Sequence, residues 1–233
     1  MKQTIEKYIS ENNIINIILS PQKNSEIFTN EIYLTDENSD ILQKIILSDK
    51  YISVEIYCEF DSYKNIDVLS YTNEIFIHAN ISTENLLDMI HYPVNLRKLT
   101  LTSSYISKID VQNKLFEKKF LKYIKIRVSS DVNVNDIYKI MEIKSLDNLY
   151  LYEFSNNYLS SEHILQILCY IVNNLNKNIT IILDLYEQDK TLRKFISLIT
   201  YNFKIYDNNY IFTYITPAFR KFDNLYDFNL YYQ

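Results

Sequence analysis

The stretch LRKLTLTSSYI, residues 96–106, contains the pattern that decides the fold. Leu99 and Leu101 flank Thr100, and alternate positions of a β-strand lie on the same face of a sheet. Polar residues follow at Thr102 and Ser103, where we expect the chain to leave the strand. The stretch therefore predicts a short strand whose two leucines face a core.

The same apolar-x-apolar core recurs along the chain and predicts eight strands. The first residues of successive cores lie between 21 and 32 residues apart. Internal periods of about 20 to 50 residues are typical of proteins that stack one structural unit on the next. The cores are Ile32–Leu34, Val54–Ile56, Ile75–Ile77, Leu99–Leu101, Ile124–Ile126, Leu149–Leu151, Ile181–Leu183 and Tyr210–Phe212.

Segments with helical spacing of apolar residues lie between these cores. Each follows polar residues that can cap a helix, which predicts helices after residues 39–40, 82–84, 133–136, 160–162 and 188–189. Strands that alternate with helices favour right-handed crossovers and a largely parallel sheet. The predicted fold class is therefore α/β.

Residues 96–106 resemble the leucine-rich repeat pattern L-x-x-L-x-L-x-x-N-x-L, with Ser104 in place of the Asn. Residues 75–80 supply the Asn itself as Asn80, and residues 121–126 and 146–151 match the first half of the pattern. The resemblance covers residues 30–215. It implies a leucine-rich-repeat-like solenoid of about eight parallel strands alternating with helices, and a role in protein binding. The family's Asn position reads Glu37, Glu59, Asn80, Ser104, Ser129 and Phe154 here.

The predicted organisation is one repeat domain over residues 1–233. Residues 1–30 are an N-terminal cap, 31–215 are the repeats and 216–233 are a C-terminal cap. The excess of Ile, Asn, Lys, Tyr and Phe is typical of a very AT-rich genome. Together with the repeats, it makes the chain similar to degenerate leucine-rich repeat proteins of large AT-rich DNA viruses such as insect poxviruses. That similarity implies the host-cell cytoplasm as the location.

Composition argues against several classes of function. The 233 residues include no glycine, which excludes a Walker loop, a dinucleotide fingerprint and a G-x-S-x-G elbow. The net charge of -5, without a basic stripe, disfavours nucleic acid. Two cysteines fit a reduced compartment, and neither a signal peptide nor a membrane span is evident, so we expect an intracellular protein without a membrane partner.

Catalysis and cofactor binding have no support in the spacing of reactive residues. His78, His91 and His163 do not stand at metal-binding spacing, and Cys58 and Cys169 form no C-x-x-C pair. Cys169 and His163 are six residues apart, a poor alignment for a nucleophile and its base on one helix. We therefore expect no enzyme activity, no metal and no cofactor.

The candidate binding site is a row of side chains on the strand face opposite the core. Exposed aromatic residues with arginine are typical of interface hot spots, although cross-strand aromatic pairs also stabilise sheets without any binding role. The leading hypothesis is a protein-binding module of unknown partner. The alternatives are a structural or self-assembling, virion-type protein, and a single-stranded nucleic-acid binder that stacks bases on tyrosine. The row comprises Tyr33, Glu55, Tyr57, Phe76, His78, Thr100, Lys125, Arg127, Tyr150 and Tyr152.

Overall fold

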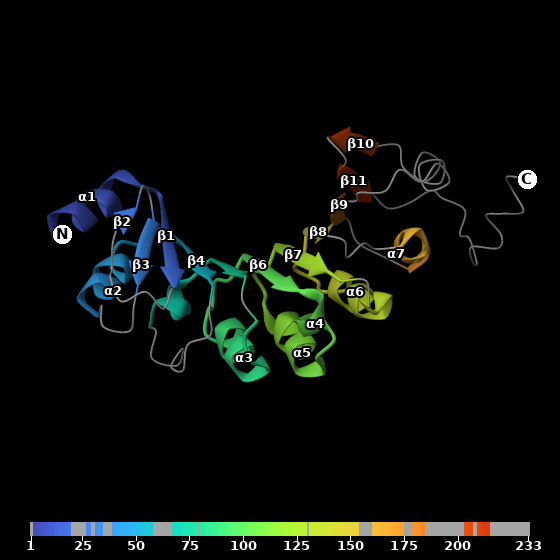
Figure 1. Ribbon diagram of the computed structural model, residues 1–233, viewed down its shortest axis with the longest axis horizontal. Coiled ribbons are helices and arrows are strands. Elements are labelled where there is room, and N and C mark those ends of the chain that lie inside the picture. The colour runs from blue at the N-terminus through green and yellow to red at the C-terminus, as the bar shows by residue number, and fades with distance from the viewer. Residues whose placement is uncertain are drawn as a thin grey trace, which may run out of the picture. The chain divides into compact units, whose positions relative to one another are not determined.

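A computed structural model of the chain describes residues 2–19, 27–28, 31–34, 39–57, 67–78, 80–129, 131–153, 160–174, 179–184, 203–206 and 209–214. Helices alternate with strands through these residues (Figure 1), so the predicted α/β class is confirmed. The chain divides into two compact units. Unit 1 comprises Met1–Leu101 and Asn113–Leu121, and unit 2 comprises Thr102–Gln112 and Lys122–Gln233.

Unit 1 is built on strands in the order β2-β3-β1-β4-β5-β6. Neighbours from β3 to β6 run parallel, and β2 runs antiparallel to β3. The elements are α1 (Lys2–Glu11), β1 (Ile14–Leu19), β2 (Ile27–Phe28), β3 (Glu31–Leu34), α2 (Ser39–Ile46), β4 (Tyr51–Ile56), the 3-10 helix η2 (Asp67–Tyr71), β5 (Glu74–Ile77), α3 (Thr83–His91) and β6 (Lys98–Thr102). The cores predicted at 32–34, 54–56, 75–77 and 99–101 all lie in these strands.

β1 lies inside the sheet, within the stretch that the sequence assigned to an N-terminal cap. It pairs with β3 on one side and β4 on the other, so that Ile17 is opposite both Ile32 and Val54. Ile15 and Ile17 are completely buried. The run of isoleucines from 14 to 18, interrupted only at Asn16, has no clear apolar-polar alternation, and strands buried on both sides lose that signal. Strand order in this part of the sheet therefore differs from chain order.

Unit 2 has its strands in the order β7-β8-β9-β11-β10. β7, β8 and β9 are parallel, as predicted, whereas β11 pairs antiparallel with both β9 and β10. The elements that begin in this unit are α4 (Ser103–Ile106), α5 (Ile109–Glu117), β7 (Tyr123–Val128), α6 (Val134–Met141), β8 (Asn148–Glu153), α7 (Ser161–Asn174), β9 (Ile179–Asp184), β10 (Phe203–Tyr206) and β11 (Asn209–Tyr214).

The prediction of about eight parallel strands was wrong for the last of them. The core 210–212 lies in β11, which follows the unpredicted strand β10. Only two residues separate Tyr206 from Asn209, which suffices for a hairpin, whereas a parallel return needs a dozen or more. A link of only two residues therefore requires these two strands to run antiparallel.

Within each unit the successive parallel strands have their helices on one face. β4, β5 and β6 follow one another across unit 1 with η2 and α3 between them, and β7, β8 and β9 do so in unit 2 with α6 and α7 between them (Figure 1). Right-handed crossovers that all advance in one direction place their helices on the same side. In each unit we call the opposite side of the strands its outer face.

Burial along the strands agrees with this arrangement. In β7 the side chains of Ile124, Ile126 and Val128 are buried toward the helices, while the alternate side chains of the outer face are half-buried. In β4, Ile52, Val54 and Ile56 are buried in the same way. Each buried isoleucine contributes about 1.5–3 kcal/mol relative to an exposed one, so this alternation fixes which face each strand turns to the core.

The predicted caps are present at three helices. The Ser82 hydroxyl accepts from the Asn85 backbone N–H, Asn133 Oδ1 accepts from the Asn135 N–H, and the Ser160 hydroxyl accepts from the His163 N–H. The sequence did not predict α1, α4 or α5. The helix predicted after 188–189, the tail 216–233 and Cys58 lie outside the described residues.

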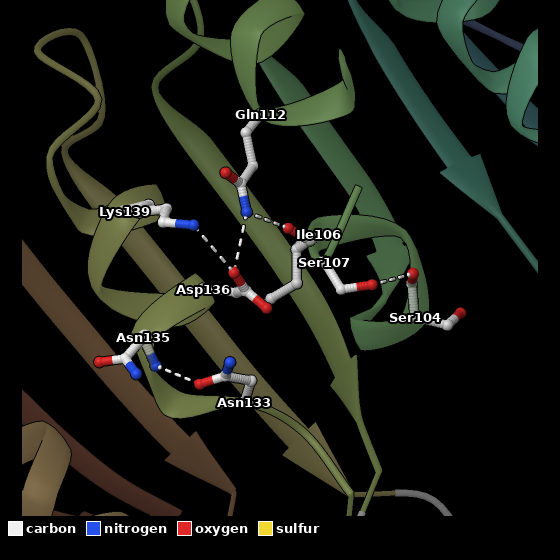
Figure 2. A network of polar contacts seen from close by, with 8 residues as sticks. All are labelled: Ser104, Ile106, Ser107, Gln112, Asn133, Asn135, Asp136 and Lys139. Atoms are coloured by element: carbon white, nitrogen blue, oxygen red, sulfur yellow. Dashed lines mark hydrogen bonds and ion pairs between the residues drawn. The ribbon is translucent and has the colours of Figure 1, made fainter. Parts of the chain in front are cut away.

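Helices α5 and α6 carry a buried polar network (Figure 2). Gln112 and Asp136 are 2% and 7% exposed, and the Gln112 amide donates to Oδ1 of Asp136 over 3.0 Å. The same amide nitrogen donates to the carbonyl of Ile106, and Lys139 Nζ lies 3.3 Å from the Asp136 oxygen. This network lies on the helix side of the sheet and ties α5 to α6.

Candidate functional site

The predicted residues of unit 1 form a four-residue patch on the outer face. We call Glu55, Tyr57, Phe76 and His78 the Glu55 patch. The strand register places Glu55 opposite Phe76 in β4 and β5, and Tyr57 and His78 directly follow the last paired residues, Ile56 and Ile77. The patch therefore lies at the carboxyl ends of two adjacent parallel strands.

The rings of the Glu55 patch are nearly parallel. The Tyr57 and His78 ring centroids are 4.6 Å apart with planes 13° from parallel, and those of Phe76 and His78 are 6.4 Å apart at 8°. Tyr57 is 52% exposed. Stacked rings at these separations attract one another, so they hold the imidazole and the phenol in defined positions at the surface.

A carboxylate at the edge of these rings completes the patch. The Tyr57 hydroxyl donates to Oε2 of Glu55 over 2.8 Å, and His78 Nε2 lies 3.5 Å from the same oxygen. The side chains of His78 and Glu55 are 38% and 30% exposed. The patch thus combines an accessible carboxylate oriented by two neighbours with exposed ring surface.

In unit 2 the predicted residues form a second group of different charge. We call Lys125, Arg127, Tyr150 and Tyr152 the Lys125 patch. The Lys125 ammonium lies 4.6 Å from the Tyr150 ring centroid and 4.4 Å from that of Tyr152, and the register places Arg127 opposite Tyr152. Burial raises the pKa of Tyr152, and the positive charge of Arg127 lowers it by less. The Tyr152 ring thus carries the Lys125 ammonium over its face and has Arg127 as its cross-strand neighbour.

Two of the predicted residues do not join these groups. Thr100 was expected to face solvent, but it is buried with 4% exposure. Its partner in the register is Phe76, whose larger side chain lies beside it on the same face. Tyr33 lies in β3 opposite Ile18 of β1, and its side chain is outside the described residues.

The sequence analysis missed three charged or polar residues at the start of the same outer-face rows. Lys98 Nζ lies 3.3 Å from the nearly buried carboxylate of Glu74. Burial, reinforced by the negative charge of Glu74, raises the pKa of Tyr51 to about 12. Glu74 and Lys98 precede their apolar cores by one residue and Tyr51 precedes its core by three, so continuing the strand alternation toward the N-terminus would have placed all three on this face.

The remaining reactive side chains point to no catalytic or metal chemistry within the described residues. The described residues contain no group of three or more His, Cys, Asp or Glu side chains that could hold a metal ion. Cys169 is half-buried, and burial raises the pKa of its thiol, which favours the unreactive protonated form. In the described part of the chain, no helix combines the length and apolar character needed to cross a membrane.

The outer-face patches are therefore the strongest candidates for a functional site. Their side chains can stack, accept hydrogen bonds and offer charge, which are the elements of recognition. Neither a scan of protein-family models nor searches of curated proteins and of solved structures gave a match to this chain.

Proposed function

We propose that this protein is a binding module of leucine-rich-repeat-like construction that holds a protein partner against the outer face of its parallel strands. The observation that carries the proposal is the Glu55 patch, where parallel rings and an oriented carboxylate meet at the exposed ends of β4 and β5. Exposed aromatic side chains with defined orientation supply large contact area at low entropic cost.

A purely structural role explains this patch less well. Aromatic pairs stabilise a sheet when they lie opposite one another within a ladder. The backbone ladder reaches His78, whose N–H donates to the Ile56 carbonyl over 2.9 Å, and Tyr57 keeps half of its surface exposed. The stack therefore lies at the very end of the strand pair, where much of the Tyr57 ring remains available to a partner.

The leucine-rich-repeat-like construction is supported by a contact between two successive strand exits. Ser103 follows β6 and Ser129 follows β7, and their hydroxyl oxygens are 2.7 Å apart. The Ser103 hydroxyl also accepts from the Ser129 backbone N–H over 3.1 Å. In the leucine-rich repeat family an Asn side chain bonds the backbone of neighbouring turns where the chain leaves the strand; Ser129 occupies that Asn position in its unit, and Ser103 directly precedes it, at Ser104, in the other. We propose that serine replaces it here.

The test is affinity capture of a partner with the wild-type chain and with a variant in which Tyr57, Tyr150 and Tyr152 are all changed to Ala. We expect at least a tenfold loss of capture, since each hot-spot aromatic contributes more than about 1 kcal/mol. The matched control is Tyr71→Ala, because Tyr71 is 53% exposed but lies in η2. Circular dichroism checks that each variant is folded. A partner retained equally by all three chains would overturn the proposal.

Self-association is a second candidate, favoured by apolar side chains exposed away from the sheet. Leu47 is 83% exposed and Val94 is 70% exposed, each in a turn. Sedimentation at increasing concentration tests this candidate. Assembly that Leu47→Ser and Val94→Ser together abolish would support it, and a monomer at high concentration would reject it.

A further inference from the structure

We propose that the Glu55 patch receives a cationic side chain, preferentially the guanidinium of an arginine, from the protein partner. The inference rests on the proposed function, because it assigns the chemistry of the partner at one point of the outer face. It follows from the arrangement at the ends of β4 and β5, where the Glu55 carboxylate can still accept hydrogen bonds and lies beside three nearly parallel rings.

The Glu55 carboxylate retains hydrogen-bonding capacity. Both of its contacts, from the Tyr57 hydroxyl and from His78 Nε2, use the oxygen Oε2. A carboxylate offers about four lone-pair sites on two oxygens, and within the described residues both polar interactions of Glu55 leave Oε1 without a hydrogen bond or ion pair. The carboxylate is thus oriented by its neighbours but can accept further donors.

The charge of Glu55 also lacks a strong counter-charge. Among the described residues, no lysine or arginine lies within ion-pair distance of Glu55. Glu74, which lies two residues before Phe76 in β5 and on the same face, provides the contrast, since Lys98 Nζ lies 3.3 Å from its carboxylate. The basic partner of Glu55 among these residues is the imidazole of His78, at 3.5 Å. A cation from outside would complete the site.

The rings favour the same kind of ligand. The faces of aromatic rings attract ammonium and guanidinium groups within about 6 Å of the centroid. The Lys125 patch shows this contact within the same protein, with an ammonium 4.4 Å from the ring of Tyr152. Tyr57, the most exposed ring of the Glu55 patch, can provide such a surface beside a carboxylate.

Other ligands fit less well. An anion would meet the negative charge of Glu55, and an apolar side chain packed on Tyr57 would remove water from Oε1 without replacing its hydrogen bonds. Arginine suits the patch better than lysine, because its planar fork can donate two bonds to a carboxylate and stack on a ring at the same time.

The experiment uses the full chain and a defined probe, an acetylated and amidated hexa-arginine peptide. The chain has three histidines, so imidazole NMR signals report on His78 separately from His91 and His163. We expect the His78 signal to shift and saturate as the peptide is added, with smaller changes at the other two. Hexa-lysine should bind more weakly, and hexa-glutamate should leave His78 unchanged.

Two variants of equal charge isolate the role of Glu55. Glu55→Gln keeps the shape of the side chain and should weaken the apparent affinity at least tenfold. Glu117→Gln removes one negative charge from an exposed site on α5 and should change it less than twofold. A His78 signal that does not respond, or a Glu55→Gln chain that binds like Glu117→Gln, would overturn the inference.

The outcome can be separated from that of the proposed function. If Tyr57→Ala abolishes capture of the partner while Glu55→Gln preserves both capture and the hexa-arginine response, the binding face stands and the cation site is rejected. If capture survives the three tyrosine changes while Glu55→Gln removes the hexa-arginine response, the cation site stands and the proposed function fails.

Discussion

The side-chain amide of Gln112 and the carboxylate of Asp136 form a buried hydrogen bond of 3.0 Å between α5 and α6 (Figure 2). Both residues are less than a tenth exposed, and the second donor to this carboxylate, Lys139, is half exposed. A buried polar group whose partner is removed bears the full cost of its desolvation. Removing either residue of the pair should therefore destabilise the fold, because the other would remain buried without its hydrogen-bond partner.

Changing Asp136 to Ala is expected to lower the free energy of unfolding by about 1–3 kcal/mol, because it leaves one N–H of the Gln112 amide unpaired. Lys139→Ala is the control and should cost less than about 1 kcal/mol, since that ion pair is partly exposed. The double variant Gln112→Leu with Asp136→Leu should recover part of the loss. Urea unfolding measures all four chains, and equal costs for Asp136→Ala and Lys139→Ala would contradict this account.

Stability should fall with rising pH above about pH 10 because of two stacked tyrosines. The rings of Tyr138 and Tyr170 are 4.0 Å apart and 4° from parallel, and the Tyr170 hydroxyl donates to Glu142 over 2.7 Å. Burial raises the pKa of each to about 12, with Glu142 adding to the effect at Tyr170. In the unfolded chain both tyrosines ionise near the ordinary pKa of tyrosine, 10.0, so their contribution to stability is complete below that pH and is lost as the pH approaches 12.

The measurement is the urea midpoint at pH 8 and at pH 11 for the wild type and for Tyr138→Phe. Phenylalanine keeps the ring stack but cannot ionise, so we expect a smaller decline than in the wild type. Tyr71→Phe, which changes an exposed tyrosine of η2, is the matched control and should decline like the wild type. A Tyr138→Phe chain that loses as much stability as the wild type would show that this tyrosine does not contribute.

Much of the fold could be predicted from local pattern. Seven of the predicted cores lie in parallel strands. Alternate residues of each strand face the helices and are apolar, so the apolar-x-apolar pattern identifies these strands directly. The caps at Ser82 and Asn133 were predictable for a similar reason, since a helix N-terminus leaves backbone N–H groups that a nearby side-chain oxygen can satisfy.

What could not be predicted depends on long-range register. The isoleucine-rich segment 14–19 is compatible with a strand or a buried helix, so its position between β3 and β4 could not be predicted from the sequence. On the outer face the alternation identified the row of residues but not their contacts. That Tyr57 stacks on His78, whereas Thr100 is buried beside Phe76, follows from which residues the register brings opposite one another.

Changing Lys125 to Met should destabilise unit 2 by about 0.5–2 kcal/mol, because the methionine keeps the apolar stem but loses the cation above two tyrosine rings. Tyr150→Phe should cost less, since the ring surface remains. Lys122→Met is the control, as Lys122 forms an exposed ion pair with Asp147 over 3.1 Å. Thermal unfolding of the three variants distinguishes them, and equal melting temperatures for Lys125→Met and Lys122→Met would argue against a cation–π contribution.

Asp49 shows how a chain without glycine makes a left-handed turn. It follows α2 with φ of 52°, the single positive value among the described residues. A residue with a Cβ bears a cost of about 1–2 kcal/mol in this conformation, less for Asp than for most, whereas glycine adopts it freely. Glycine also gives the unfolded chain more conformational freedom, which lowers the free energy of unfolding by about 0.4–1 kcal/mol.

Asp49→Gly should therefore be stabilising by up to about 1 kcal/mol, a rise in melting temperature of about 2–4 °C at most for a chain of this size. Asn95→Gly is the matched control, because Asn95 also lies in an exposed turn but is not among the positive-φ residues. At Asn95 glycine relieves no backbone strain and only makes the unfolded chain more flexible, so the melting temperature should fall. If both glycine variants melt below the wild type by the same amount, backbone strain at Asp49 is too small to matter, and aspartate serves this turn as well as glycine would.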